Sequence, residues 1–354
     1  MVATIRDIAA ELDLSHTTVS RVLNGKQVQA RVSPACAKRV RETAARLGYR
    51  RNTAARSMST GRFNAVALVL SNAPHRSTLP SSLLAGIHDA LAASGQRLLV
   101  SCLPDEWLTD ERRAPSFLTE LTCDGLLMNY HAHIPAQLED LVDRCQLPAI
   151  WLNVKRKHDC VYPDDHAAVN RLTQNLLALG HRRILYADFS MTRASQTGTL
   201  HYSKVDRRDG YLAAMAAASL PSEVVLDPPE DEEIDSRNAN ACFPGLLAAR
   251  LRQPDHPTAA VGYSDVETQI CQRAAALAGL RVPEDFSVAT VVSDEGWAAG
   301  LFGTAAILPE RKMGRQAVQM LLERIAHPEK HLQPMVLPAI HEAGYSTAAR
   351  QTGA

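Results

Sequence analysis

The chain has 354 residues, more than a single hydrophobic core usually organises, so at least two domains are expected. Hydrophobic residues make up 46% and charged residues 21% of the sequence, which excludes the disordered and fibrous classes. The zero net charge hides an asymmetry. Residues 1–62 hold 12 of the 38 Lys and Arg but only four of the 38 acidic residues, which leaves 26 basic and 34 acidic residues in the other 292. A basic head is typical of proteins that bind polyanions, although a merely solvated basic surface has the same composition.

Neither the cysteines nor the first residues indicate an exported protein. The seven cysteines are scattered without CxxC spacing, which predicts free thiols in a reducing compartment rather than a disulfide framework or a zinc ribbon. Charges at Arg6, Asp7 and Glu11 do not fit a signal peptide, and no apolar run approaches the roughly 18 residues of a membrane span. We therefore expect a cytoplasmic protein without a membrane partner.

Three short helices are predicted in the first fifty residues. Each begins at a side chain that can cap a helix: Thr4 with Asp7 in capping-box position, Ser15, and Ser33 followed by Pro34. Apolar residues at helical spacing follow each cap, and Asn24-Gly25 and Gly48 end the second and third helices. Two short helices joined by a tight turn and covered by a third predict a helix-turn-helix, with an ordinary three-helix bundle as the alternative.

The second of these helices has a polar outer face. Its apolar positions Val19 and Val22 lie on one side, whereas His16, Thr17 and Arg21 leave that side. Arg can bond guanine bidentately in the major groove, and Thr and His offer shorter polar contacts. This pattern favours a recognition helix.

The residues TIRDIAAELDLSHTTVSRVLNG and VSPACAKRVRETAARLGYRRNTAARSMSTG resemble the headpiece and hinge of the LacI/GalR family of bacterial transcription regulators. The resemblance implies three sets of DNA contacts. Base-reading positions are His16, Thr17 and Arg21; phosphate contacts are Thr4, Ser20 and Asn24; and hinge positions in the minor groove are Asn52, Ala55 and Met58. Met58 stands where the family usually has a leucine wedge between the central base pairs.

From residue 63 onward, apolar runs alternate with amphipathic stretches, which predicts an α/β fold with parallel sheets and helices on both faces. Strands are expected at 65–70, 97–102, 125–128, 149–152, 184–187, 224–226, 259–262 and 287–292. Helices are expected at 81–94, 115–121, 136–145, 166–179, 208–218, 239–251 and 266–277.

No catalytic motif or cofactor-binding loop occurs, so neither an enzyme nor a cofactor is expected. His131 and His133 have a spacing that a metal ion can use, but a loop after a strand is the preferred interpretation.

The stretches GLLALGHRRILYADF, RRDGY and GLRVPEDFSVATV resemble the sensor domain of the same family. The resemblance implies a periplasmic-binding-protein-like domain of two lobes joined by three crossovers, with an effector in the cleft. We expect a helix-turn-helix domain at 1–50, a hinge at 51–62 and a sensor domain at 63–350. The N-lobe is expected at 63–163 and 292–320, and the C-lobe at 164–291 and 321–350.

Five residues are expected to contact the effector. Arg207 matches an effector-binding arginine of the family; Asp265 matches an acid after a C-lobe strand, or else caps the following helix; and Asn129, Asn153 and Asp164 follow strand ends. Two departures stand out, because Val292 replaces a family aspartate that bonds sugar hydroxyls and Gly344 replaces a family arginine.

The sequence therefore predicts a homodimeric transcription regulator that binds pseudo-palindromic operators and responds to a sugar or related metabolite. A repressor is the preferred interpretation, with an activator as the alternative. Its dimer is expected to use helix 81–94. Three alternatives stay open: a transport protein of the same body fold, an enzyme with an activity in the cleft, and an architectural DNA binder whose pocket has decayed.

Overall fold

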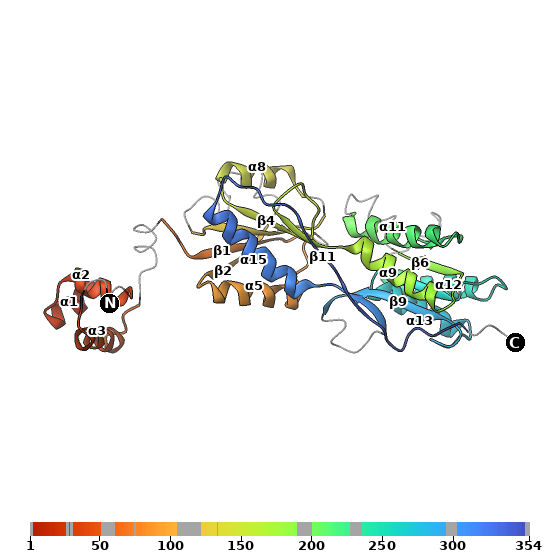
Figure 1. Ribbon diagram of the computed structural model, residues 1–354, viewed down its shortest axis with the longest axis horizontal. Helices are drawn as coiled ribbons and strands as arrows, with labels where there is room; N and C mark the ends of the chain where they lie inside the picture. Colours follow the sequence, from red (N-terminus) through yellow and green to blue (C-terminus); the bar gives the residue numbers. More distant parts are fainter. Residues whose placement is uncertain are drawn as a thin grey trace. The chain divides into compact units, whose positions relative to one another are not determined.

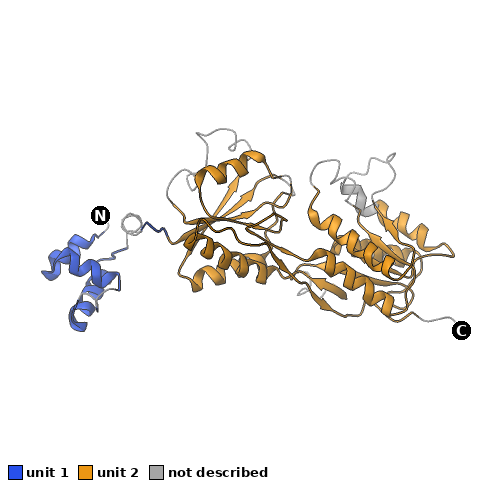
Figure 2. Ribbon diagram, turned by 45° about the horizontal axis from the view of Figure 1, so that its top comes forward, with its two compact units in different colours: residues 1–63 blue, residues 64–354 orange. Residues whose placement is uncertain are grey.

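The computed structural model describes residues 3–25, 28, 31–50, 61–73, 76–104, 122–132, 134–189, 200–226, 236–294 and 303–350, without the side chains of 236–241. It divides into two compact units, residues 1–63 and 64–354 (Figure 2). The division lies within one residue of the expected start of the sensor domain. The expected hinge residues Asn52, Ala55 and Met58 lie outside the described residues, as does the expected helix 115–121.

The first unit contains the three predicted helices, α1 (Ile5–Leu12), α2 (His16–Leu23) and α3 (Pro34–Arg46) (Figure 1). The predicted caps are confirmed: Thr4 and Asp7 form a capping box, Ser15 accepts from the Thr18 N–H, and Ser33 accepts from the Cys36 N–H. Each cap satisfies a backbone donor that the first helical turn leaves free. The three helices share one buried core, whose members are Ile8, Ala9, Val19, Val22, Leu23, Ala37, Val40 and Ala44.

The second unit contains two six-stranded sheets, one in each lobe. The N-lobe sheet has the order β11-β5-β4-β3-β1-β2, and its strands pair in parallel. In chain order these strands are β1 (Ala65–Ser71), β2 (Arg97–Leu103), β3 (Gly125–Asn129), β4 (Ala149–Leu152), β5 (Cys160–Pro163) and β11 (Met335–Leu337). Helices α5 (Ser81–Ala93) and α15 (Glu310–Ala326) cover one face of this sheet, and α8 (Ala136–Cys145) lies on the other (Figure 1).

The C-lobe sheet has the order β12-β10-β9-β8-β6-β7, with only β12 antiparallel to its neighbour. Its strands are β6 (Ile184–Ala187), β7 (Glu223–Val225), β8 (Ala259–Gly262), β9 (Ser287–Val292), β10 (Thr304–Ile307) and β12 (Ile340–Glu342). Successive strand residues alternate between two cores. Leu185 and Ala260 pack with helices α12 (Ser236–Leu251) and α13 (Asp265–Leu277), whereas Tyr186 and Val261 pack with α9 (Asp165–Ala178) and α11 (Tyr202–Ala217).

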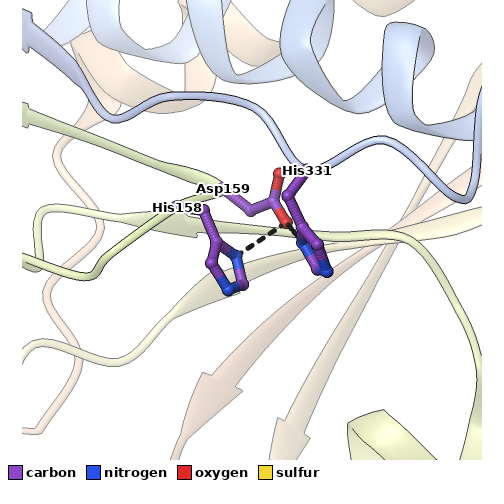
Figure 3. A group of neighbouring side chains, drawn as sticks. All are labelled: His158, Asp159 and His331. Carbon is purple, nitrogen blue, oxygen red and sulfur yellow. Dashed lines mark hydrogen bonds and ion pairs between the residues drawn. The ribbon is translucent and has the colours of Figure 1, made fainter.

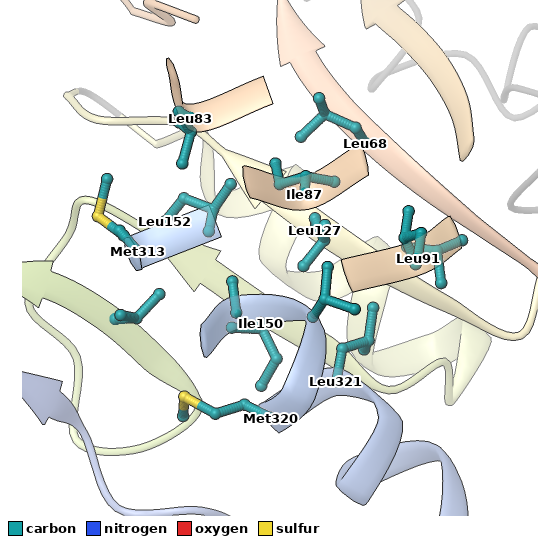
Figure 4. Close-up of a cluster of buried hydrophobic side chains, with 14 of the residues drawn as sticks. Leu68, Leu83, Ile87, Leu91, Leu127, Ile150, Leu152, Met313, Met320 and Leu321 are labelled. Carbon is teal, nitrogen blue, oxygen red and sulfur yellow. The ribbon is translucent and has the colours of Figure 1, made fainter. Parts of the chain in front are cut away.

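The N-lobe core lies between the sheet and the α5–α15 pair (Figure 4). Leu83, Ile87 and Leu91 of α5 meet Met313 and Leu321 of α15 over the apolar strand residues. The two helices approach closely, because a Cβ on Gly86 would collide with the backbone of Arg311 and one on Gly314 with that of Leu83. The C-terminal part of the chain is therefore an integral part of the N-lobe.

This arrangement corrects the expected lobe boundaries. Residues 304–307 form β10 of the C-lobe sheet, whereas residues 310–337 return to the N-lobe as α15 and β11. The chain crosses between lobes near residues 164, 309 and 338, so the N-lobe comprises 64–163 and 310–337 and the C-lobe 164–308 and 340–350. The expected boundaries at 292 and 320 are wrong, because the chain adds β10 to the C-lobe sheet before α15 returns to the N-lobe.

None of the helices in the described part of the chain is both long and apolar enough to cross a membrane.

Candidate DNA-binding head and effector cleft

The outer face of α2 carries the predicted base-reading side chains. His16, Thr17 and Arg21 are exposed, while Val19 and Val22 are buried against α1 and α3. In the described part of the chain Arg21 forms no salt bridge, so its guanidinium is available to a partner. Because the core holds the apolar side of α2, this helix can offer only its polar side to DNA.

The three predicted phosphate contacts lie at helix ends of the same unit. Thr4 and Asn24 are exposed and Ser20 is partly buried. The Thr4 hydroxyl donates to Asp7 Oδ2 (2.8 Å), and Asn24 Nδ2 donates to Ser20 Oγ (3.3 Å). These contacts orient the side chains within the unit, and their role on phosphate stays a prediction.

A cavity of about 240 Å³ lies between the two lobes of the second unit. Its N-lobe wall includes Thr78, His131 and Asn153, and its C-lobe wall includes His201, Ser203, Arg207 and Tyr263. The cavity lies beyond the carboxyl ends of parallel strands, since Asn153 follows β4, and Tyr263 follows β8. Ligands bind at this position in open α/β sheets.

Arg207 is the buried cation of this cavity. Its Nε donates to Asp165 Oδ1 (2.6 Å), its Nη1 donates to the Tyr263 carbonyl (2.6 Å), and its guanidinium lies 4.6 Å from the centre of the Tyr263 ring. Burial by itself lowers the pKa of Arg207, but Asp165 together with Tyr263 and Tyr186 raises it by more, so the guanidinium is charged. The prediction that Arg207 lies at the cleft agrees with this geometry.

The acid that meets Arg207 is Asp165, which the sequence reasoning missed in favour of Asp164. Asp164 is the N-cap of α9 and accepts from the Ala167 N–H (3.0 Å). Asp165 follows as the first helical residue and is buried, and its Oδ2 lacks a hydrogen-bond partner among the described residues. The signal was the repeated Asp-Asp, in which one residue caps the helix and the other pairs with Arg207.

The two predicted asparagines differ in position. Asn153 lines the cavity in a left-handed conformation (φ 54°), and its Oδ1 accepts from the Tyr202 hydroxyl across the lobes (3.1 Å). Asn129 is fully buried behind the wall, where Nδ2 donates to the Thr78 carbonyl (2.9 Å) and Oδ1 contacts His131 Nε2 (2.7 Å). Asn129 therefore positions the side chain of His131 rather than lining the cavity.

Asp265 is exposed at the first turn of α13 and does not line the cavity. The alternative interpretation, that Asp265 caps this helix, is wrong because Ser264 is the N-cap and forms a capping box with Glu267. The Ser264 hydroxyl, on a shorter side chain than that of Asp265, accepts from the Val266 N–H (3.2 Å) and so caps the helix.

Two histidines that were not predicted as effector contacts face each other in the cavity wall. The rings of His131 and His201 lie 5.8 Å apart, and His201 Nε2 contacts the Asn153 carbonyl (2.8 Å). Burial lowers the pKa of His131 to about 3 and that of His201 to about 4, so both rings are neutral near pH 7. His133, the other half of the considered metal pair, lies outside the described residues.

The two departures from the family pattern have structural correlates. Val292 is buried at the end of β9 in a small cluster with Ala305 and Ile307, so an apolar side chain packs there. A Cβ on Gly344 would collide with the backbone of Gly303, and therefore this neighbourhood has no room for an arginine. Val292 lies at the carboxyl end of its strand, the end that faces the cleft, whereas Gly344 lies beside Thr304 at the start of β10. Only the first departure therefore removes a polar group on the side of the cleft.

A basic three-helix head joined to a two-lobe sensor domain defines a class, the ligand-controlled DNA-binding regulators. Residues 4–52 match the family model described as bacterial regulatory proteins, lacI family, and residues 173–347 match that of the periplasmic binding protein-like domain. The chain belongs to the LacI family, and it is a DNA-binding transcription regulator rather than an enzyme.

Relatives of the same length support this assignment. The regulator CelR of Thermobifida fusca is 29% identical over 337 residues, covering 91% of this chain and 92% of the relative. The maltose regulon regulatory protein MalI of Escherichia coli K12 is 26% identical, covering 95% and 96% of the two chains.

Among solved structures, a lac repressor dimer bound to operator and the anti-inducer ONPF superimposes with a TM-score of 0.76 at 21% identity, covering 99% of this chain and 100% of the other. A complex of the regulator CelR with cellobiose gives a TM-score of 0.60 at 24% identity, with coverages of 97% and 99%. These two structures share the fold of this chain.

Proposed function

We propose that the protein is a cytoplasmic, homodimeric repressor that binds a pseudo-palindromic operator and responds to a sugar or related metabolite. The observation that carries the proposal is the exposed polar face of α2, with His16, Thr17 and Arg21, on a unit rich in basic residues. In a dimer, two such helices read two half-sites in successive major grooves. The hinge residues Asn52, Ala55 and Met58 would meet at the centre of the operator.

The effector would bind in the cavity between the lobes and change their relative geometry. Arg207 offers a fixed, charged donor at its wall, and Asn153 already connects the lobes through His201 and Tyr202. A ligand that replaces or reinforces these contacts binds one arrangement of the lobes more tightly than the other. Only such a difference in affinity shifts the equilibrium between the two arrangements. The relatives named above, of which one is seen with cellobiose, make a sugar the first candidate.

The test is selection of bound duplexes from a random pool with the full chain, followed by binding of the selected sequence across a salt series. We expect an enriched pseudo-palindrome and an affinity that falls steeply with salt. Arg21→Ala should cost about 1–3 kcal/mol and relax the preference at one position in each half-site.

Lys38→Ala is the matched control, because Lys38 is an exposed cation of the same unit that pairs with Glu42 along α3. It should keep the sequence preference of the wild type. A pool without any enriched site, together with weak binding at low salt, would refute the repressor.

The second candidate is a DNA binder that needs no effector, which the apolar environment of Val292 favours. Thermal unfolding with a panel of mono- and disaccharides distinguishes the two functions. A rise in Tm that is absent in Arg207→Gln supports the effector, whereas an unchanged Tm across the panel supports the second candidate.

A further inference from the structure

Away from the cleft, three potential metal ligands converge in the N-lobe (Figure 3). His158 and Asp159 lie between β4 and β5, and His331 lies between α15 and β11. His158 Nδ1 is 3.0 Å and His331 Nδ1 is 2.5 Å from Asp159 Oδ2, and the three ligand atoms lie within 4.8 Å of one another. Because 172 positions separate Asp159 from His331, no local spacing motif could have revealed the cluster.

The two oxygens of Asp159 have different partners. Oδ1 accepts from the Leu332 N–H (2.8 Å) and lies 3.4 Å from Arg324 Nε, whereas Oδ2 faces only the two imidazoles among the contacts described. Arg324 also binds the carbonyls of Pro328 (2.6 Å) and Lys330 (2.8 Å), which holds the loop that carries His331. A carboxylate oriented by outer hydrogen bonds, with one oxygen turned to two imidazoles, is the arrangement that supports metal ligands.

The cluster is open on one side. The side chain of Asp159 is 7% exposed, but those of His158 and His331 are 47% and 58% exposed, so an ion and its water can reach the ring nitrogens. Ligands about 2.0–2.1 Å from a tetrahedral ion lie roughly 3.3 Å apart. The two ring nitrogens lie 3.0 and 2.5 Å from Asp159 Oδ2, so each needs to move by less than about 1 Å from that oxygen to reach this spacing.

We propose that His158, Asp159 and His331 form a binding site for a divalent transition metal ion of the zinc type, with water completing the coordination. Two imidazole nitrogens and one carboxylate oxygen suit Zn²⁺, Co²⁺ or Ni²⁺, whereas Mg²⁺ and Ca²⁺ prefer all-oxygen ligands. This inference is independent of the proposed effector and operator.

An ion at this site would join two segments of the N-lobe that are far apart in the sequence. Strands of the N-lobe sheet are parallel, so the start of β5 and the start of β1, where the chain enters the second unit, lie at the same edge of that sheet. An ion held there joins the segment before β5 to the loop after α15. Two separate parts of the N-lobe are thus tied together at this edge.

The test is calorimetric titration of the full, chelator-treated chain with Zn²⁺, with Mg²⁺ in a parallel experiment. We expect one Zn²⁺ per chain with the highest affinity and no comparable Mg²⁺ binding. The chain has 13 histidines and seven cysteines, and any of them can bind zinc weakly. Variants are therefore needed to show where the tightly bound Zn²⁺ lies. His158→Gln and His331→Gln should each lower the affinity for the tightly bound Zn²⁺ by more than about tenfold.

His327→Gln is the matched control, since His327 is an exposed histidine of the same loop outside the cluster. It should bind Zn²⁺ as the wild type does. Co²⁺ provides a second readout, because its visible absorption reports tetrahedral coordination and should be lost in both cluster variants. Asp159→Asn also disturbs Leu332 and Arg324, so its thermal unfolding is measured beside its Zn²⁺ affinity. The proposal would be overturned if the wild type bound no Zn²⁺ tightly, or if both histidine variants kept a tightly bound Zn²⁺.

Discussion

At the scale of single residues, the buried pair of Arg207 and Asp165 has a structural role besides the binding role proposed for Arg207. Both side chains are less than a tenth exposed, so each charge depends on the other for compensation. Arg207 could be identified from the sequence through the pattern RRDGY, whereas Asp165 could not. Its choice over Asp164 depends on where α9 begins, and helix boundaries are least certain at their first residue.

We predict that Arg207→Gln lowers the free energy of unfolding by about 3–5 kcal/mol, because it leaves the Asp165 carboxylate buried without a cation. The double variant with Asp165→Asn should recover a large part of this loss, since no uncompensated charge is left. Urea unfolding of both variants measures the effect. Equal losses in the single and double variants would contradict the coupling.

The two neutral histidines of the cleft predict a loss of stability in acid. Because burial lowers the pKa of His131 to about 3 and that of His201 to about 4, the unfolded chain binds their protons first as the pH falls below about 6.5. Their contribution to stability is therefore complete above pH 6.5 and is lost progressively toward pH 4. Each histidine changes the unfolding equilibrium by at most about tenfold per pH unit.

Unfolding of the wild type and of His131→Gln/His201→Gln between pH 7.5 and 4.5 checks this prediction. The double variant should show a shallower dependence on pH, whereas His166→Gln, at an exposed position of α9, should follow the wild type. Identical slopes in all three proteins would show that other groups govern the acid response.

At the scale of elements, the sequence predicted best where an apolar run is short and flanked by turn residues. Strands 149–152, 184–187, 259–262 and 287–292 have their predicted bounds because burial on both faces makes each run mostly apolar. Helix α11 begins at Tyr202, six residues before the expected start, because its first turn has polar residues that are buried at the cleft instead of exposed. Buried polar residues thus obscured the helical pattern.

Glycine-to-alanine substitutions should change stability in opposite directions inside the α5–α15 contact and outside it. Gly86→Ala and Gly314→Ala should each destabilise the protein by about 1–3 kcal/mol, because the added methyl group meets the backbone of the other helix. Gly245→Ala in α12 should instead stabilise it by up to about 1 kcal/mol, since that position has open space around it. Thermal unfolding distinguishes these signs, and a stabilising Gly86→Ala would contradict the described helix contact.

At the scale of the whole molecule, the proposed dimer needs an interface. Helix α5, which was expected to form it, uses its apolar side against α15. The neighbouring edge strand β2 exposes Leu99 and Val100, the latter by 56%. An exposed apolar sheet edge favours pairing with a second chain.

We predict that Val100→Lys weakens the dimer and, with it, the affinity for the two half-sites of the operator. Sedimentation velocity measures the first effect and DNA titration the second. Leu246→Lys is the control, because Leu246 is similarly exposed (48%) on α12 of the C-lobe. A dimer that persists in Val100→Lys would place the interface elsewhere.

The three crossings between the lobes also determine the order in which the protein can be completed on the ribosome. Strands β1 to β5 are synthesised early, but the apolar side of their sheet is covered only by α5 until α15, at residues 310–326, has been made. The C-lobe, although it begins later, lacks only β12 when that happens. A nascent chain therefore carries the apolar face of an unfinished N-lobe through the synthesis of about 150 further residues, roughly 10–30 s at bacterial rates. A nonsense mutation between residues 309 and 326 would consequently leave the N-lobe without a complete α15 and without β11, whereas the C-lobe would lack only the segment that contains β12.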